Sequence, residues 1–315
     1  MNRCPITYDE CGVSFYSQRG LHLLNKNLSN LNHFPLTASE QRKEALVRAG
    51  KISIQGIQPK LSARLSVKKS VFEIVDKGGH YILKPQHSVY PELPENEGLT
   101  MHLADLAGMD VPLNGLMYSR DGSLTYFIRR FDRVGKGTKI ATEDFAQISG
   151  KDRDTKYNFS MEKVSALLEK HCTFPAVERA KLFRRSLFSF LIGNEDMHLK
   201  NFSLIRRDGM IELSPMYDYL NTTIALQAIG KPIEEIEELA LPLRGKKQNL
   251  TRKDLIDYFG RERLQLTVKV IDGCLQVLET TIPEWYDLIK TSFLSDSMKI
   301  LYSELLYRRC VVLEL

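Results

Sequence analysis

Several features that define other protein classes are missing from this sequence. Its five cysteines are scattered and never form a Cys-x-x-Cys pair, which argues against a disulfide framework or a zinc knuckle. No run of eighteen apolar residues occurs, and the first residues do not resemble a signal peptide. We find no internal repeat and no low-complexity tract. We therefore expect a globular protein of the reducing cytoplasm, without a membrane partner.

The excess of positive charge is also small. Lysine and arginine number 44 against 39 aspartates and glutamates, which gives a formal net charge of +5. This balance permits an anionic partner such as a nucleotide, but nucleic-acid-binding modules usually carry a denser basic stripe. The 315 residues, 43% of them apolar, are enough for two packed lobes.

The pattern of the chain predicts three parts. Residues 1–50 have the composition of an N-terminal cap segment of turns and short helices, with one helix from Thr37 to about Val47. Residues 51–133 carry strand patterns, and residues 134–315 are mostly helical. Because sheet-rich and helix-rich regions follow one another along the chain, the expected fold class is α+β with two lobes.

Local patterns predict the main elements of each lobe. In the N-lobe we expect a strand at 61–66, a hairpin of 71–75 and 80–84 around Asp76–Gly79, a helix from about Glu95 to Gly108, and a hairpin of 115–118 and 124–128. In the C-lobe we expect a buried helix at 176–192, a hairpin of 202–205 and 210–213, and helices over 253–315 with a break at Pro283.

The strongest chemical signal follows the buried helix. Asp196 and Asn201 lie five residues apart in a predicted loop, and Asp218 follows the next hairpin. Phosphoryl transfer needs a carboxylate that orients the acceptor hydroxyl, and oxygen ligands that hold Mg²⁺ against the phosphates. Asp-x-x-x-x-Asn, a hairpin and a second Asp supply these groups in the order that protein kinases use. The alternative is a solvated loop with capping side chains.

A second signal lies in the N-lobe. Lys84 closes a predicted apolar strand, where a lysine is placed to pair with the phosphates of ATP. Glu95 and Glu97 open the following helix, and either is able to hold that lysine. The alternative is a strand-end lysine that extends to solvent and a glutamate that caps a helix.

The candidate phosphate loop is weak as a motif. The segment 53–60 contains one glycine, Gly56, and therefore no Gly-x-Gly-x-x-Gly pattern. Ser53, Gln58 and Lys60 are able to donate hydrogen bonds to phosphate from this loop. The alternative is an ordinary turn before a strand. A Walker A loop at 135–138 is rejected because its lysine precedes the second glycine.

These motifs resemble the HipA family of bacterial serine/threonine kinase toxins. The resemblance covers residues 50–250, and its most specific part is the Asn-x-Asp-x-His-x-Lys-Asn motif. It rests on segments 53–62, 81–85, 95–97, 129–133, 144–147, 193–201 and 217–218. The resemblance implies a two-lobe protein-kinase-like fold that uses ATP and Mg²⁺.

The resemblance also implies roles for individual residues. Asp196 corresponds to the catalytic aspartate, Asn201 and Asp218 to the magnesium ligands, and Lys84 to the ATP lysine. The implied nucleotide-binding set comprises Ser53, Gly56, Gln58, Lys60, Lys84, Glu97, Arg129, Phe131, Gln147, His198 and Lys200. Ser53 corresponds to a loop serine that family members autophosphorylate. A phosphate there would repel ATP or draw the loop toward cations.

The start of the chain is similar to the short HipT form of the three-component HipBST systems. In those systems a separate small protein resembles the subdomain that longer family members carry. The implied partners are HipS-like and HipB-like antitoxins, with DNA contacted only through an antitoxin. The implied substrate is a protein such as an aminoacyl-tRNA synthetase. Gln55 stands where some relatives have a second loop serine.

Two other functions are compatible with the residues. One is a small-molecule kinase on the same scaffold. The other is a non-catalytic nucleotide-binding or DNA-associated regulator. The intact set of Asp196, Asn201 and Asp218 argues against a pseudokinase. The small charge excess and the lack of a helix-turn-helix signature argue against autonomous DNA binding.

Overall fold

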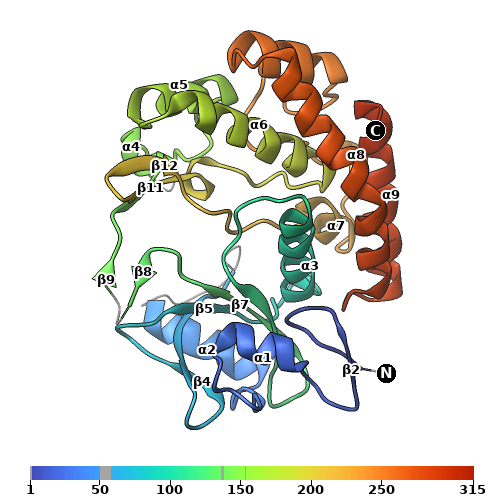
Figure 1. Ribbon diagram of the computed structural model, residues 1–315. Coiled ribbons are helices and arrows are strands. Elements are labelled where there is room, and N and C mark those ends of the chain that lie inside the picture. Colours follow the sequence, from blue (N-terminus) through green and yellow to red (C-terminus); the bar gives the residue numbers. More distant parts are fainter. Residues whose placement is uncertain (1, 50–57, 136–137, 153) are drawn as a thin grey trace.

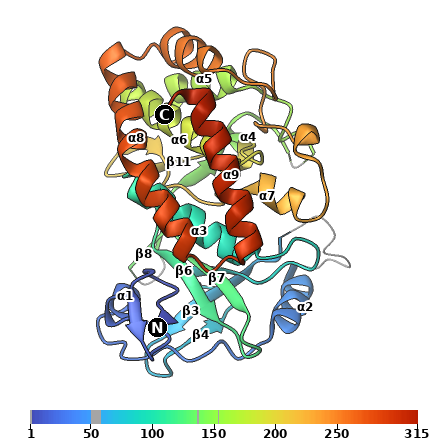
Figure 2. The same ribbon diagram turned by 90° about the vertical axis from the view of Figure 1, so that its right-hand side faces the viewer.

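The computed structural model of this chain has two lobes. It describes residues 2–49, 58–135, 138–152 and 154–315. A five-stranded sheet with α1 and α2 forms the lower part of Figure 1, and α5, α6, α8 and α9 form the upper part. Helix α3 lies between the sheet and the pair α8–α9 (Figure 2). The α+β, two-lobe prediction is confirmed.

The N-lobe is built on an antiparallel sheet with strand order β4-β3-β5-β7-β6. The predicted helix near Thr37 and the predicted strands are present with ends shifted by a few residues. The elements are β1 (Asn2–Arg3), β2 (Glu10–Gly12), α1 (Gln18–Leu24), α2 (Ala38–Ala49), β3 (Leu61–Ser66), β4 (Val71–Ile74), β5 (Tyr81–Lys84), α3 (Leu93–Leu106), β6 (Asn114–Tyr118) and β7 (Leu124–Arg129).

One predicted hairpin is wrong. Strands β4 and β5 do not pair with each other, because β3 lies between them and pairs with both. Val75 N and His80 N, at the two ends of the predicted turn, donate to the β3 carbonyls of Ser62 and Ala63. Gly79 passes so close to β3 that a Cβ there would lie 2.0 Å from Ser62 Oγ. Turn residues mark where a chain reverses, but they do not determine which strand it pairs with.

The two faces of the sheet are buried against different parts of the chain. Side chains alternate along β7, so Tyr126 and Ile128 face α3 and the C-lobe, while Phe127 faces the other way. Phe127 packs with buried residues of the first 49, such as Leu21 and Phe34. The N-terminal segment therefore supplies the second half of the N-lobe core. Where the domain boundaries fall stays a prediction.

The C-lobe is mostly helical, with a three-stranded sheet of order β10-β11-β12. The predicted buried helix and the third hairpin are confirmed as α6 and β11–β12. The elements are β8 (Arg133–Val134), β9 (Thr138–Lys139), β10 (Thr142–Asp144), α4 (Phe145–Ile148), α5 (Met161–His171), α6 (Pro175–Leu191), η1 (Leu199–Asn201), β11 (Ser203–Arg207), β12 (Met210–Leu213), α7 (Thr222–Gln227), η2 (Ile233–Glu235), η3 (Lys253–Arg263), α8 (Val268–Thr291) and α9 (Asp296–Leu313).

The predicted break at Pro283 is also wrong. Helix α8 continues through Pro283, which lies on the exposed side of the helix. Ile282 and Trp285 on the opposite side are buried. A proline inside a helix costs about 3 kcal/mol. Burial of several large apolar side chains along α8 outweighs that cost.

Two further findings concern the whole described part of the chain. The five cysteines are all free thiols, and four of them are buried. Among residues 2–49, 58–135, 138–152 and 154–315, no helix combines the length and the apolar character needed to cross a membrane.

Candidate active site

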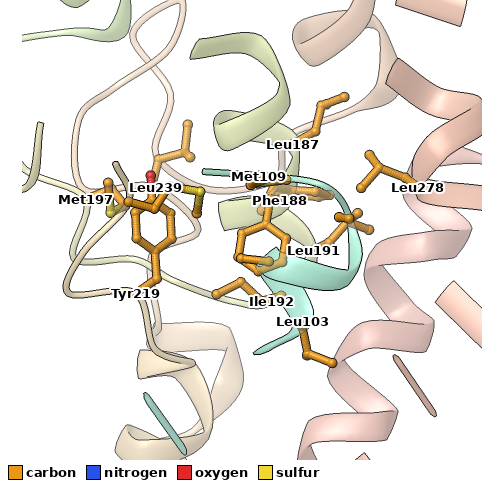
Figure 3. Close-up of a cluster of buried hydrophobic side chains, with 14 of the residues drawn as sticks. Leu103, Met109, Leu187, Phe188, Leu191, Ile192, Met197, Tyr219, Leu239 and Leu278 are labelled. Atoms are coloured by element: carbon orange, nitrogen blue, oxygen red, sulfur yellow. The ribbon is translucent and has the colours of Figure 1, made fainter. Parts of the chain in front are cut away.

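Buried side chains hold the loop that carries Asp196 and the segment around Asp218. Met197 follows Asp196 directly and is buried, and Tyr219 follows Asp218 directly and is also buried. Figure 3 shows both side chains in the same hydrophobic cluster, which also contains Phe188 of α6. Each aspartate is thus adjacent to a residue anchored in the core, which limits how far either can move.

A glycine ends α6 just before the loop. Gly193 has φ +68°, and a Cβ at this position would lie 2.3 Å from Leu305 of α9. Both the backbone conformation and the lack of space require glycine here. The chain can therefore leave α6 directly into the loop that carries Asp196.

The centre of the site is a buried cluster of one lysine and two carboxylates. Lys84 Nζ at the end of β5 donates to Glu97 Oε1 and to Asp218 Oδ1, each at 2.5 Å. The side chains of Lys84 and Glu97 are 1% and 0% exposed. The ammonium also lies 5.6 Å from the centre of the Tyr126 ring. Burial alone would lower the pKa of Lys84, but Asp218 and Glu97 outweigh burial and raise it, so the lysine stays charged.

Only one of the two candidate glutamates reaches the lysine. Glu97 pairs with Lys84, while Glu95 accepts two hydrogen bonds from Gln86 Nε2, at 2.6 and 2.9 Å. Burial raises the pKa of Glu95 to about 7, although the hydrogen bond from Gln86 opposes the shift. Two glutamates that are two residues apart therefore have different environments on the same helix.

Helix α3 is tied to the C-lobe beside Glu97. Asn96 Nδ2 donates to the carbonyl of Asn221, and Asn96 Oδ1 accepts from the main-chain N–H of Asn221, at 2.9 and 2.8 Å. One turn further along α3, the Thr100 hydroxyl lies 2.9 Å from Tyr302 OH of α9. These contacts fix Glu97 relative to Asp218, which lies three residues before Asn221.

Asp218 is held by two lysines and has an unusual backbone conformation. Lys60 Nζ donates to its second oxygen, Oδ2, at 2.7 Å, so each carboxylate oxygen faces an ammonium group. Burial would raise the pKa of Asp218, but Lys60 and Lys84 outweigh it and hold the pKa far below its ordinary range. Its φ of +58° is uncommon for aspartate and is often found at functional sites.

Asp196 lies in a less buried part of the site, with its side chain 44% exposed. Its main-chain N–H donates to Asn194 Oδ1 at 3.2 Å, and its carbonyl accepts from Asn201 Nδ2 at 2.8 Å. Its Oδ1 accepts a hydrogen bond from Tyr157 OH at 2.5 Å and lies 3.8 Å from His198 Nε2. Burial lowers the pKa of His198 although Asp196 opposes the shift, so the imidazole is neutral near pH 7.

The other predicted residues contact different parts of the chain around this cluster. The ring of Phe131 lies 5.4 Å from that of Tyr217, whose hydroxyl donates to the Lys200 carbonyl at 2.9 Å. Gln58 Nε2 is 3.5 Å from Glu97 Oε2. Arg129 ends β7 with an exposed side chain, and its N–H donates to the Leu113 carbonyl.

Two sets of predicted residues are not brought into this cluster. Gln147 forms a capping box with Asp144 at the start of α4 and lines a surface pocket beside His171 and Arg206. The two hydrogen bonds between Gln147 and Asp144 therefore stabilise the first turn of α4. Ser53 and Gly56 lie outside the described residues.

The chemistry of the site fits a magnesium ion that arrives with a nucleotide. Asp218 offers a carboxylate, and Asn201 offers an amide oxygen because its nitrogen is already bonded to the Asp196 carbonyl. Mg²⁺ prefers such oxygen ligands and takes others from water and phosphates. In the described part of the chain, no three or more His, Cys, Asp and Glu side chains form a group able to hold a metal.

Sequence reasoning assigned no role to Tyr157 or to Asn96. Tyr157 lies in a polar loop before α5, where neither spacing nor hydrophobic pattern marks it. Asn96 lies between the two glutamates that were considered, but its partner is main chain 125 residues away. A buried asparagine needs a hydrogen-bond partner, so Asn96 in this buried helix turn is the one local sign of a contact with a distant part of the chain.

Comparisons with known proteins identify similar sequences. The family model described as the HipA-like C-terminal domain matches residues 52–285. A protein of Haemophilus influenzae named as a candidate kinase is 30% identical over 79% of this chain and 75% of its own length. A similarly named protein of Sinorhizobium fredii is 38% identical over 77% of this chain and 61% of its own length.

Relatives with more specific names are more distant. The serine/threonine-protein kinase toxin HipA of Shewanella oneidensis is 28% identical over 54% of this chain, which spans 43% of the toxin. The structure of a Shewanella oneidensis HipA, in complex with HipB and operator DNA, has a TM-score of 0.69. It shares 21% identity, and the match covers 91% of this chain and 73% of that one.

A second solved structure has the same fold. The Helicobacter pylori kinase CtkA has a TM-score of 0.52 at 17% identity, covering 74% of this chain and 86% of that one. At such low identity, the two structural matches show the two-lobe fold alone. Together with the family model, which covers most of the sequence, they lead to one conclusion: the chain belongs to the HipA family of kinases.

Proposed function

We propose that this protein is an ATP- and Mg²⁺-dependent serine/threonine protein kinase. One observation carries the proposal: Lys84, Glu97 and Asp218 already form a buried ion-pair cluster. Such a lysine and glutamate, with a metal-binding aspartate, are the parts that phosphoryl transfer requires. The nearby Asp196 and Asn201 add the groups for the acceptor and the metal.

Each side chain has a separate task in this reaction. Asp196 accepts a hydrogen bond from the acceptor hydroxyl and then its proton, as the hydroxyl oxygen bonds to the γ-phosphorus and ADP leaves. Lys84 and Lys60 offer cationic donors to the phosphate oxygens. Asn201 and Asp218 would hold Mg²⁺, which when bound neutralises charge on the transferring group.

The wider biological role is part of the same proposal. The solved HipA relative is bound to HipB and operator DNA. By analogy, this chain would act as a toxin restrained by HipB-like and HipS-like antitoxins, and contact DNA only through them. Its substrate would be a protein of translation such as an aminoacyl-tRNA synthetase. Ser53 would be its autophosphorylation site, and Gln55 would leave the loop with one such serine.

Transfer of labelled phosphate tests the kinase assignment. Purified protein incubated with γ-labelled ATP, Mg²⁺ and bacterial lysate should label one or more proteins on serine or threonine. Asp196→Asn should reduce labelling by at least about a hundredfold, because general-base catalysis contributes about that much or more. Asp272→Asn, at an exposed position of α8, is the matched control and should retain full activity.

Three results would contradict the proposal. The first is undiminished labelling by Asp196→Asn. The second is label only in small molecules, which indicates a small-molecule kinase. The third is tight binding of nucleotide without any transfer, which indicates a non-catalytic regulator.

A further inference from the structure

The hydroxyl of Tyr157 contacts the carboxylate that we assign as the catalytic base. Tyr157 OH donates to Asp196 Oδ1 at 2.5 Å, a charge-assisted hydrogen bond. Burial and this hydrogen bond both raise the pKa of Tyr157, so the hydroxyl keeps its proton.

The loop that carries Tyr157 is attached to the catalytic loop at more than this one point. The carbonyl of Lys156 accepts a hydrogen bond from Leu199 N at 3.4 Å. The Tyr157 ring meets the His198 ring edge-on, with centres 5.2 Å apart. At the start of the loop, Lys151 N donates to the Ala146 carbonyl of α4 at 2.7 Å. The position of the hydroxyl therefore does not depend on Asp196 alone.

The Tyr157 hydroxyl restrains the Asp196 side chain, whereas the other hydrogen bonds of Asp196 restrain its main chain. The main chain of Asp196 is held on both sides by Asn194 and Asn201, which leaves rotation of the side chain free. Tyr157 restrains that rotation by bonding one carboxylate oxygen. We assign the second oxygen, Oδ2, to the acceptor hydroxyl. A base held in a single orientation reacts faster, because the reactive geometry exists before the substrate binds.

We propose that Tyr157 is a positioning residue that holds the Asp196 carboxylate in the orientation that accepts a proton from the acceptor hydroxyl. The proposal rests on the kinase function proposed above. A different interpretation is that Tyr157 occupies the place of the acceptor and leaves when a substrate binds. The additional attachment of its ring and main chain favours the positioning role.

Steady-state kinetics of Tyr157→Phe tests this inference. The variant keeps the ring and removes only the hydroxyl, so kcat should fall about tenfold to a hundredfold. The KM for ATP and the affinity for a non-hydrolysable ATP analogue should stay unchanged, as should the thermal unfolding midpoint. Tyr307→Phe, at an exposed position on α9, is the control and should match the wild type. Tyr157→Leu, which also removes the ring, should lose at least as much kcat as Tyr157→Phe.

Four outcomes would overturn the positioning role. Unchanged or increased kcat in Tyr157→Phe means that the hydroxyl does not assist Asp196. Full activity of Tyr157→Phe with loss only in Tyr157→Leu assigns the effect to packing of the ring. Equal losses of kcat and ATP affinity indicate a merely structural role. Phosphate found on Tyr157 by mass spectrometry makes it an acceptor. All four require an active wild-type enzyme, so they are distinct from failure of the kinase assignment itself.

Discussion

The two aspartates of the site lie in regions that are built differently. Asp218 is 24% exposed and each of its oxygens faces a lysine, while α3 is bonded to the chain just beyond it. Asp196 is 44% exposed, and its carboxylate is restrained by one neutral hydroxyl. The side that would bind nucleotide and metal is thus assembled within the core. The side that would meet the acceptor is open.

This difference follows from the charges involved. A buried carboxylate without a partner is costly, so Glu97, which is 0% exposed, requires Lys84 whether or not a nucleotide is bound. An exposed carboxylate such as Asp196 keeps its hydration and needs no cation.

The largest effect should come from removing the shared lysine. Lys84→Met leaves the buried Glu97 without its cation, while Asp218 keeps Lys60, and breaking a buried pair such as Lys84–Glu97 costs about 3–5 kcal/mol. Urea unfolding measures the loss. Lys69→Met is the control, because it removes a pair whose lysine side chain is 70% exposed, and it should cost no more than about 1 kcal/mol. Equal losses in the two variants would show that the cluster is not buried as described.

The environment of each region could be predicted from sequence only in part. The order of strand lysine, helix glutamate, Asp196 loop and second aspartate was visible because each motif is local. The hairpin of β6 and β7 and the end of α6 at Gly193 were visible for the same reason. These signals depend on residues within about one turn or one strand of each other.

The errors and omissions concern contacts between distant residues. The insertion of β3 between β4 and β5 depends on pairing that turn residues do not determine. The choice of Glu97 over Glu95 depends on which way each side chain leaves α3. Tyr157 reaches Asp196 across 39 residues of sequence. In each case tertiary packing decides, and a single sequence does not contain that information directly.

The next effect concerns the pH dependence that Glu95 of α3 gives to the stability of the fold. The folded-state pKa of Glu95 is about 7, above its ordinary value of 4.5. Between these values the folded protein keeps a proton that the unfolded chain has released, so stability falls as pH rises from about 4.5 to 7. Glu95→Gln removes this loss. The variant should match the wild type near pH 4.5 and exceed it by about 3 kcal/mol at pH 8.

A glutamate with the opposite shift serves as the control for that experiment. Lys69 and Arg64 lower the pKa of Glu73, so ionisation of Glu73 favours the folded state. Glu73→Gln should therefore lose stability, relative to the wild type, as pH rises from the lowered pKa to the ordinary value of 4.5, and the loss should stay constant at higher pH. Urea unfolding across the acidic range and at pH 8 measures both variants. A parallel response of the two would contradict the assigned environments.

The smallest effect compares the two lysines on Asp218. Lys60 and Lys84 contact the same carboxylate, but the Lys60 side chain is 44% exposed. Lys60→Met should cost no more than about 1 kcal/mol, and the difference from wild type should vanish near 1 M NaCl, where the Debye length is about 3 Å. The cost of Lys84→Met should persist at that salt concentration, because solvent does not reach the buried pair. Urea unfolding at low and high salt measures both variants. A salt-insensitive loss in Lys60→Met would place Lys60 within the buried cluster and remove the contrast between the two oxygens of Asp218.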